Sequence, residues 1–305
     1  MKGKTIKIIL NKKFNEWVES IDNNNLKKII KTDTIITGGS IVSLLLNEKP
    51  KDFDIYFRHK DTALEVAKYY VEKFNSKHKN KIQAYVLDGD DNEEKENIEP
   101  GRIKIIIKSS GVLAENENIL KEDFEDVYDV LDDADDMPAE KLEEEKEKYR
   151  PIFLSSNAIT LSNQIQIIIR FYGEPEEIHS NYDFVHCTCF WTSFDDKLVL
   201  PSEALETILS KTLIYMGSKY PVCSVIRTRK FIKRGWNINA GQYLKMLFQI
   251  SKLDLSNIDV LEDQLVGVDS AFFMNLIESL KRKIKNDEDF VIGNEYICSI
   301  IDKIF

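Results

Sequence analysis

The sequence predicts an α+β protein, in which a mixed α/β front half is followed by an all-helical rear half. Short β-branched and alternating apolar runs, which are typical of strands, recur before residue 200. After Pro201 the apolar residues recur instead at helical spacing. We therefore expect two domains, residues 1–200 and 201–305, with an acidic insertion at about 113–150 in the first domain.

The front half is expected to alternate between the two types of element. In chain order, the expected elements are helices at 14–31, a strand at 34–37, a short helix at 41–46, a strand at 52–57, a helix at 61–74, strands at 81–86, 103–107, 158–161 and 164–171, a short helix at 174–179 and a strand at 185–191. The rear half is expected to hold helices at 202–218, 222–234, 240–251, 270–285 and 295–304.

The first functional signal is a glycine pair between a strand and a helix. The run 34–37 reads as a strand, Gly38 and Gly39 interrupt it, and Ser40 stands where it could cap the next helix. The backbone amides of such a turn, together with the helix dipole, attract anions, and glycine leaves room for a close approach. The segment therefore predicts a phosphate-binding turn.

A pair of aspartates forms the second signal. Asp52 and Asp54 belong to an alternating stretch, 52–57, so both are expected to point to the same face of a strand. Adjacent carboxylates suit hard divalent cations, and two Mg²⁺ ions can clamp the oxygens of a phosphoryl displacement. Asp-x-Asp by itself is common on solvated strands. The combination with the glycine turn favours a metal–nucleotide site.

The two signals together resemble the signature of the DNA-polymerase-β-type nucleotidyltransferase superfamily. The chain looks most like the head and neck of tRNA nucleotidyltransferases (CCA-adding) and bacterial poly(A) polymerases. The resemblance implies a head with a mixed sheet, two Mg²⁺ ions on Asp52 and Asp54, and an NTP whose β- and γ-phosphates contact Gly38, Gly39 and Ser40. It also implies an RNA acceptor.

Part of the family pattern is missing. That branch carries an Arg-Asp pair after the two glycines, where this chain has Val42 and Ser43. A later Arg-Arg-Asp-Phe-Thr element is matched by Asp183 and its following Phe, but both arginines are replaced. Asp183 is therefore expected to contact the ribose, to ligate a metal or merely to cap a turn. Gln166 is an alternative, uncharged residue facing the metals, and His186 is expected in the core.

A basic helix is the third signal. Arg227, Lys230 and Arg234 recur at helical spacing on one face, and Arg229 and Lys233 flank them. The stretch resembles the neck helix of the same family, so these cations are expected to bind triphosphate or the RNA backbone. A solvated helix is the alternative. The Asp and Arg that select the incoming base in that family are absent, which leaves base preference open.

The charge of the chain is concentrated in one segment. The net charge is −10, but residues 122–148 alone carry 14 acidic residues and 3 lysines, so the remainder is close to neutral at +1. The segment is expected to be a solvating insertion, a nucleic-acid mimic or a docking strip for a basic protein partner. No apolar run is long enough for a membrane helix and the N-terminus lacks a signal peptide, so we expect a cytoplasmic protein.

Three functions remain in competition. The first is a metal-dependent nucleotidyltransferase that transfers NMP from an NTP to an acceptor hydroxyl, foremost a tRNA-like RNA 3′ end. The second keeps this chemistry but modifies a protein or tRNA in a toxin–antitoxin or defence setting. The third is a degenerate, non-catalytic relative that binds nucleic acid, which the lost arginines favour and the retained Asp52 and Asp54 disfavour.

Overall fold

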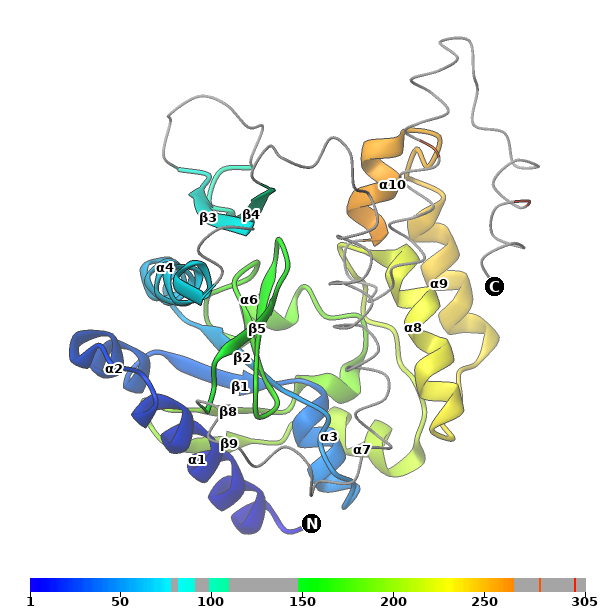
Figure 1. Cartoon of the computed structure of the whole chain (residues 1–305). Helices are drawn as coiled ribbons and strands as arrows, with labels where there is room; N and C mark the ends of the chain where they lie inside the picture. The colour runs from blue at the N-terminus through cyan, green and yellow to red at the C-terminus, as the bar shows by residue number, and fades with distance from the viewer. Residues whose placement is uncertain (78–81, 91–98, 110–147, 266–279, 281–298, 300–305) are drawn as a thin grey trace. The chain divides into compact units, whose positions relative to one another are not determined.

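The structure, a computed structural model, describes residues 1–77, 82–90, 99–109 and 148–265, together with 280 and 299. The chain divides into two compact units, whose helices and strands are labelled in Figure 1. We call Met1–Ile178 with Cys189–Val199 the sheet unit, and His179–Thr188 with Leu200–Phe305 the helix unit. Most of the acidic insertion, and nearly all of the predicted helices at 270–285 and 295–304, lie outside the described residues. The predicted division into domains 1–200 and 201–305 stays a prediction.

The sheet unit is built on a seven-stranded sheet in the order β5-β6-β7-β2-β1-β8-β9. Its strands are β1 (Thr34–Thr37), β2 (Phe53–Phe57), β5 (Pro151–Leu154), β6 (Ala158–Leu161), β7 (Ile165–Ile168), β8 (Phe190–Thr192) and β9 (Lys197–Val199). β2 and β7 pair in parallel, whereas the other neighbours in this sheet pair antiparallel. The predicted α+β class with a mixed sheet is confirmed.

A row of apolar side chains crosses this sheet, and we call it the core row. Trp191, Ile36, Ile55, Ile167 and Ile159 stand opposite one another on neighbouring strands, and each is at most 1% exposed. Burying each isoleucine stabilises the fold by about 1.5–3 kcal/mol. Because side chains alternate along a strand, the residues one position away point to the opposite face of the sheet.

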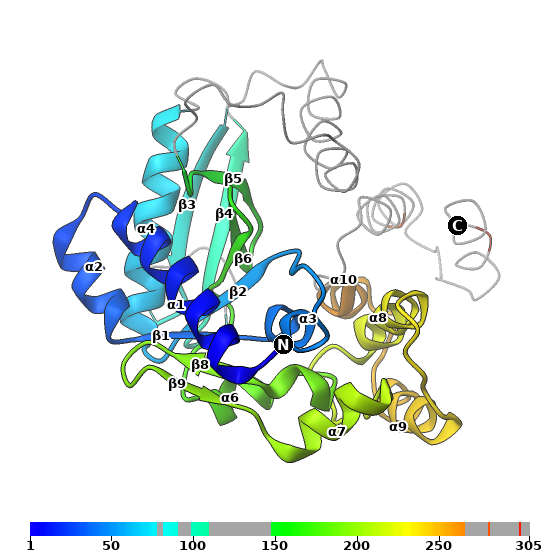
Figure 2. The same ribbon diagram turned by 90° about the horizontal axis from the view of Figure 1, so that it is seen from below.

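Helices cover the face that carries the core row. The Phe14 ring of α1 lies 5.2 Å from the Trp191 ring, and Trp17 of α1 donates from Nε1 to the Tyr70 hydroxyl of α4 at 2.8 Å. α2 packs against both of these helices (Figure 2). The helices up to this point in the chain are α1 (Gly3–Glu19), α2 (Asn24–Lys31), α3 (Gly39–Leu45) and α4 (Lys60–Lys77), and a short α6 (Pro175–His179) follows later.

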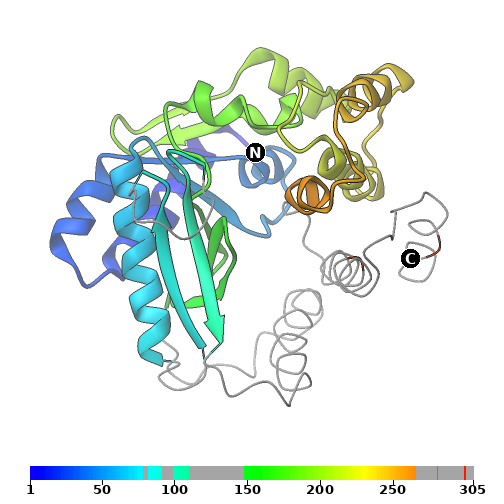
Figure 3. The same cartoon turned by 90° about the horizontal axis from the view of Figure 1, so that it is seen from above.

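A separate pair of strands extends the sheet unit. β3 (Ile82–Asp88) and β4 (Ile103–Ser109) form an antiparallel two-stranded sheet, and α4 runs along it (Figure 3). Both strands were predicted from the sequence, but their pairing was not. The Ile105 amide donates to the Ser156 carbonyl at 3.2 Å, which ties β4 to the connection between β5 and β6.

The helix unit contains the 3₁₀ helix η2 and four α-helices in its described part. These are η2 (Val185–Thr188), α7 (Ser202–Ser210), α8 (Pro221–Lys233), α9 (Ala240–Ile250) and α10 (Ile258–Leu265). Pro221 occupies the first turn of α8, where its missing N–H costs nothing. The Asn239 side chain caps α9 by accepting from the Gln242 amide.

Several predicted element ends are wrong. The predicted strand at 185–191 is instead a 3₁₀ helix followed by β8, and the predicted helix at 202–218 ends at Ser210. The reason is tertiary, because residues after Lys211 pair with distant segments through the bridges Phe184↔Tyr215 and Thr212↔Asn237. The first helix begins at Gly3, well before the predicted start at 14. β5, β9 and α10 were not predicted.

The core row can be tested by truncation. Replacing Ile36, which is 0% exposed, by Ala leaves a cavity between β2 and β8, so we expect a loss of about 2–5 kcal/mol in the free energy of unfolding. Ile8→Ala is the matched control, because Ile8 on α1 is 59% exposed and its truncation should cost less than about 0.5 kcal/mol. Urea denaturation followed by circular dichroism measures both. Equal losses would contradict the assignment of the core row.

Candidate functional site

The turn between β1 and α3 requires its first glycine and leaves space beside its second. Gly38 caps α3 with φ 88° and ψ −148°, a backbone conformation that residues with a Cβ rarely adopt. A Cβ built on Gly39 would meet no atom of the surrounding described residues within 4 Å. The backbone conformation at residue 38 therefore requires glycine. At residue 39 the described residues leave space in which another molecule could approach the backbone.

Ser40 does not cap the helix, contrary to prediction. Gly38 is the capping residue, and Ser40 lies one residue inside α3, where its side chain is 1% exposed. Within the described residues its hydroxyl has no hydrogen-bond partner. A buried hydroxyl without a partner costs about 1–3 kcal/mol, so this polar atom next to the glycine turn is unusual.

Asp54 lies on β2 beside the strand that leads into this turn. It stands opposite Thr37, the last residue of β1, and the pairing is antiparallel. Both side chains therefore occupy the face of the sheet opposite the core row. Thr37 is fully buried and donates from its hydroxyl to the Cys189 carbonyl at 2.9 Å, whereas Asp54 is partly exposed. Asp52 is exposed and precedes β2, so of the pair only Asp54 belongs to the strand.

The donors around Asp54 suit a hard cation. Two carboxylates, from Asp52 and Asp54, lie two residues apart, and Gln166 of β7 stands beside Asp54 in parallel register. Carboxylate and amide oxygens are the ligands that Mg²⁺ accepts. Across the described ranges no three His, Cys, Asp or Glu side chains gather as a metal cluster, so the charged donors here number two.

In the helix unit, two of the predicted residues meet. Arg227 of α8 donates from Nη1 to Oδ2 of Asp183 at 2.8 Å, and the Asp183 side chain is 10% exposed. The Asp183 carbonyl also accepts from the Met216 amide at 3.0 Å. The sequence predicted that Asp183 and Arg227 contact the nucleotide separately. The structure shows that the guanidinium of Arg227 is directed by the buried carboxylate.

The other predicted cations of α8 lie at its surface or are half-buried. Lys230 is exposed, and Arg234, which ends the helix, is half-buried. Arg229 and Lys233 are also exposed. The predicted basic helix therefore exists, and all five cations project at least partly into solvent, including Arg227, whose side chain is 37% exposed. Roles in binding for Arg227, Lys230 and Arg234, and in catalysis for Asp183, stay predictions.

An aromatic cluster lies beneath α8 and holds His186, the predicted core histidine. The His186 ring is fully buried, with its centroid 4.3 Å from that of Trp236 and 4.7 Å from that of Phe231. Neither ring nitrogen has a hydrogen-bond partner among the residues that the structure describes. Burial lowers the pKa of His186 to about 4, and burial also lowers the pKa of His179 to about 4. The prediction of a core histidine is confirmed.

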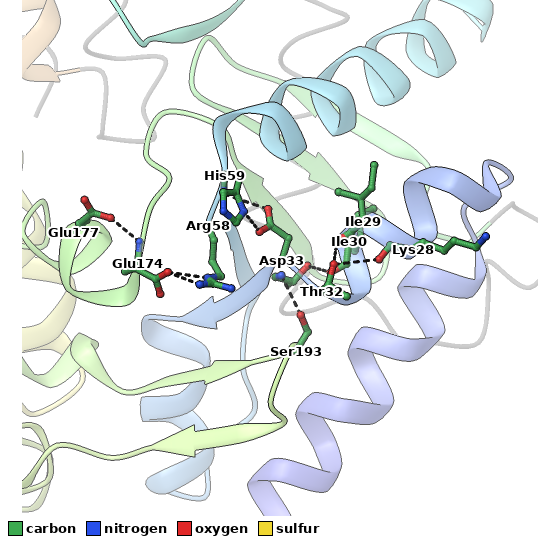
Figure 4. Close-up of polar contacts among 11 residues, drawn as sticks. Lys28, Ile29, Ile30, Thr32, Asp33, Arg58, His59, Glu174, Glu177 and Ser193 are labelled. Atoms are coloured by element: carbon green, nitrogen blue, oxygen red, sulfur yellow. Dashed lines mark hydrogen bonds and ion pairs between the residues drawn. The ribbon is translucent and has the colours of Figure 1, made fainter.

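A polar network that the sequence did not predict lies at the other end of β1 and β2 (Figure 4). The buried Asp33 carboxylate contacts the His59 ring and accepts from the His59 amide at 3.2 Å. Arg58 donates from Nε to Glu174 at 2.9 Å, and its guanidinium stacks on Phe194 at 4.2 Å. These residues are too far apart in the chain for any local pattern to reveal the network. It ties the connection between β2 and α4 to α6 and the β8–β9 hairpin.

Comparisons with known proteins identify relatives. A model of the Gabija anti-defense 2 family matches residues 8–211. A protein named "Gabija anti-defense 2" from Bacillus phage SPbetaL7 is 22% identical over 143 residues, which are 46% of this chain and 34% of that protein. The match therefore spans about one third of the length of this relative.

Solved structures similar to this chain include tRNA-processing enzymes. The Thermotoga maritima CCA-adding enzyme complexed with tRNA is 12% identical, with a TM-score of 0.37, and the match covers 88% of this chain and 54% of that one. A CCA-adding enzyme with ATP has a TM-score of 0.39 at 12% identity, covering 94% and 56%. The apo form of a tRNA-processing enzyme has a TM-score of 0.38 at 13% identity, covering 93% and 60%. None of the helices described here is long and apolar enough to cross a membrane.

The buried histidine predicts a pH dependence of stability. Because the pKa of His186 falls from 6.5 to about 4 on folding, the unfolded chain takes up its proton first as the pH drops. The stability that depends on neutral His186 is complete above about pH 6.5 and is lost between about pH 6.5 and 4. The loss reaches about 3 kcal/mol at ~1.4 kcal/mol per pKa unit.

Replacing His186 by Phe tests this dependence, because Phe keeps the ring among its aromatic neighbours and cannot be protonated. Chemical denaturation of wild type and His186→Phe at pH 7.5, 6 and 5 measures it. We expect the variant to lose less stability than wild type on acidification, with the remaining slope due to groups such as His179. Parallel pH profiles would show that His186 is not a neutral, buried group.

Proposed function

The chain belongs to the Gabija anti-defense 2 family, and from this premise we propose that it is a metal-dependent nucleotidyltransferase acting in counter-defence. It transfers NMP from an NTP to an acceptor hydroxyl and releases pyrophosphate. The family model covers residues 8–211, which include the glycine turn, Asp52, Asp54 and Asp183. The proposal rests on these residues, since the family description names a biological setting and no chemistry.

The single observation that carries the proposal is the pairing of Thr37 with Asp54. It brings the partly exposed carboxylate to the strand end from which the chain turns through Gly38 into α3. A nucleotide site needs the glycine turn and the carboxylates at one place. The turn supplies hydrogen-bond donors to the phosphates, and the carboxylates hold the cation that balances the phosphate charge. The space beside Gly39 and the Ser40 hydroxyl, which has no partner in the part of the chain that the structure describes, support binding at this turn.

The residues have distinct roles in the proposed reaction. Asp52 and Asp54 hold Mg²⁺, which when bound neutralises and polarises the phosphate oxygens of the NTP. The backbone of Gly38 and Gly39, with the Ser40 hydroxyl, orients the β- and γ-phosphates. The rate enhancement comes from positioning and charge stabilisation, and no covalent intermediate on the protein is required.

Residues of the helix unit have roles of their own in the proposal. Lys230 and Arg234 offer positive charge to the triphosphate or to a nucleic-acid backbone. The pair formed by Asp183 and Arg227 presents an acceptor and a donor held in fixed orientation, which suits contacts to the ribose or the base of the nucleotide. The residues that choose the base in tRNA nucleotidyltransferases have no counterpart here, so the base preference is expected to differ.

Family membership favours a defence setting over tRNA maturation. The name of the phage relative describes an activity against a defence system, so the acceptor hydroxyl is proposed to lie on a protein or RNA of that system. A tRNA-like 3′ end remains within this class of acceptor. The acidic segment 122–148, with its net charge of −11, is proposed to contact a basic partner.

The experiment that tests the function is a transfer assay with each of four labelled NTPs. The full chain is incubated with Mg²⁺ and with total RNA or lysate from cells that carry the defence system, and the labelled band is identified. Asp54→Asn removes one carboxylate charge at nearly constant volume, so we expect transfer to fall by more than about 1,000-fold. The melting temperature should change little, because Asp54 is not fully buried.

Glu65→Gln provides the matched control for Asp54→Asn, since Glu65 is an exposed carboxylate on α4 in the same unit. It should retain the wild-type rate. Retained transfer in Asp54→Asn would remove Asp54 from the site, and labelling of no RNA or protein by wild type would contradict the proposed chemistry.

A pair of glycine variants tests the phosphate turn. Gly39→Ala meets no neighbouring atom and should leave the free energy of unfolding unchanged or raise it by up to about 1 kcal/mol. If the phosphates approach this backbone, the added methyl group should weaken NTP binding about tenfold or more. Gly38→Ala should instead destabilise the fold by about 1–3 kcal/mol because of its φ of 88°. Calorimetric titration with a non-hydrolysable NTP separates the two effects, and unaltered affinity in Gly39→Ala would count against the turn.

A non-catalytic, nucleic-acid-binding role is the second candidate. It is favoured by Asn181 and Tyr182, which stand where the resembled family has two arginines, and by the small number of charged metal donors in the described part of the chain. A pure scaffold would bind NTP or nucleic acid equally well with and without Mg²⁺. Nucleotide binding that requires Mg²⁺ would therefore exclude it.

A further inference from the structure

A polar row lies beside the core row, on the opposite face of the sheet. It consists of Thr37 on β1, Asp54 on β2 and Gln166 on β7, which are register partners on three adjacent strands. Neighbouring strands are about 4.8 Å apart, so the side chains of register partners lie side by side on one face. The parallel pairing of β2 and β7 therefore brings the Gln166 amide next to the Asp54 carboxylate.

Gln166 is a polar residue between two buried apolar residues of β7. Its neighbours Ile165 and Ile167 are fully buried and point to the core row's face, while Gln166 itself is half-buried. No hydrogen bond of its side chain to another described residue is found. An amide can make four hydrogen bonds, so the described part of the chain leaves the carbonyl oxygen of Gln166 available.

The two carboxylates near the glycine turn are too few to form a metal site by themselves. Asp52 and Asp54 are the charged donors, and no third His, Cys, Asp or Glu joins a metal cluster in the described residues. The hydroxyl of Thr37 already donates to the Cys189 carbonyl. Among register partners of Asp54, Gln166 is thus the one that offers an uncommitted oxygen, and amide carbonyls are ordinary ligands of hard divalent cations.

We infer that Gln166 is the third protein ligand of the metal site, supplying a neutral oxygen beside Asp54. This inference rests on the proposed function. It predicts that the site binds divalent cations more weakly than the same site would with a third carboxylate. The identity of residue 166 then sets the metal affinity. A negatively charged replacement should raise the affinity, and an apolar replacement should lower it.

Metal binding to the full chain tests the inference without reference to activity. Mn²⁺ and Mg²⁺ are titrated by calorimetry into wild type, Gln166→Glu and Gln166→Leu. Gln166→Glu adds a charged ligand and should tighten binding about tenfold, while Gln166→Leu removes the ligand and should weaken binding about tenfold. Circular dichroism melts of the three proteins establish that each is folded.

Gln83→Glu is the matched control, because Gln83 is exposed on β3 in the same unit and the change adds the same charge. It should leave the affinity unchanged, which separates ligation from the long-range effect of one more negative charge. Unaltered affinity in Gln166→Leu, or weaker binding in Gln166→Glu, would overturn the assignment of Gln166.

Asp54→Asn distinguishes this failure from failure of the proposed function. If Asp54→Asn abolishes metal binding while both Gln166 variants match wild type, the metal site stands and only the third ligand is wrong. If Asp54→Asn binds metal as wild type does, the metal site itself is misplaced, and the inference about Gln166 falls with it.

Discussion

The pairing register of the central strands is the constraint on which the rest of the sheet unit depends. Ile36, Ile55 and Ile167 are fully buried side by side, and a slip of one residue in any of these strands would turn its buried side chains to the opposite face. The same register sends Asp54 and Gln166 away from α1. The hydrophobic effect thus fixes the direction of the polar groups, although they contribute little to stability themselves.

The two ends of the central strands differ in how their polar groups are satisfied. At the start of β1, Asp33 contacts His59, and Arg58 pairs with Glu174, so the polar groups there satisfy one another and hold the connections in place (Figure 4). At the other end, the Ser40 hydroxyl is buried without a partner in the described structure. Polar groups that satisfy each other stabilise a fold, whereas a buried group that the described residues leave unsatisfied calls for another partner, such as an ordered water or a bound ligand.

The helix unit combines a rigid apolar base with an oriented charge pair. His186, Phe231 and Trp236 form edge-to-face and tilted ring contacts, and such contacts define one arrangement of α8 above η2. Because α8 is fixed in this way, Arg227 reaches the nearly buried carboxylate of Asp183. The guanidinium consequently keeps a defined direction, while Lys230, one turn further along the helix, is free to follow a flexible or extended anion.

The sequence by itself determined the local elements of the candidate site. The β-branched run of β1, the glycine that φ 88° requires at residue 38, and the alternation of β2 are properties of short segments, so they were predicted correctly. Only the tertiary structure decided that β7 lies beside β2, that residues 185–188 form a 3₁₀ helix and that Arg227 meets Asp183. These features depend on contacts between residues far apart in the chain, and such contacts leave no period or spacing in the sequence.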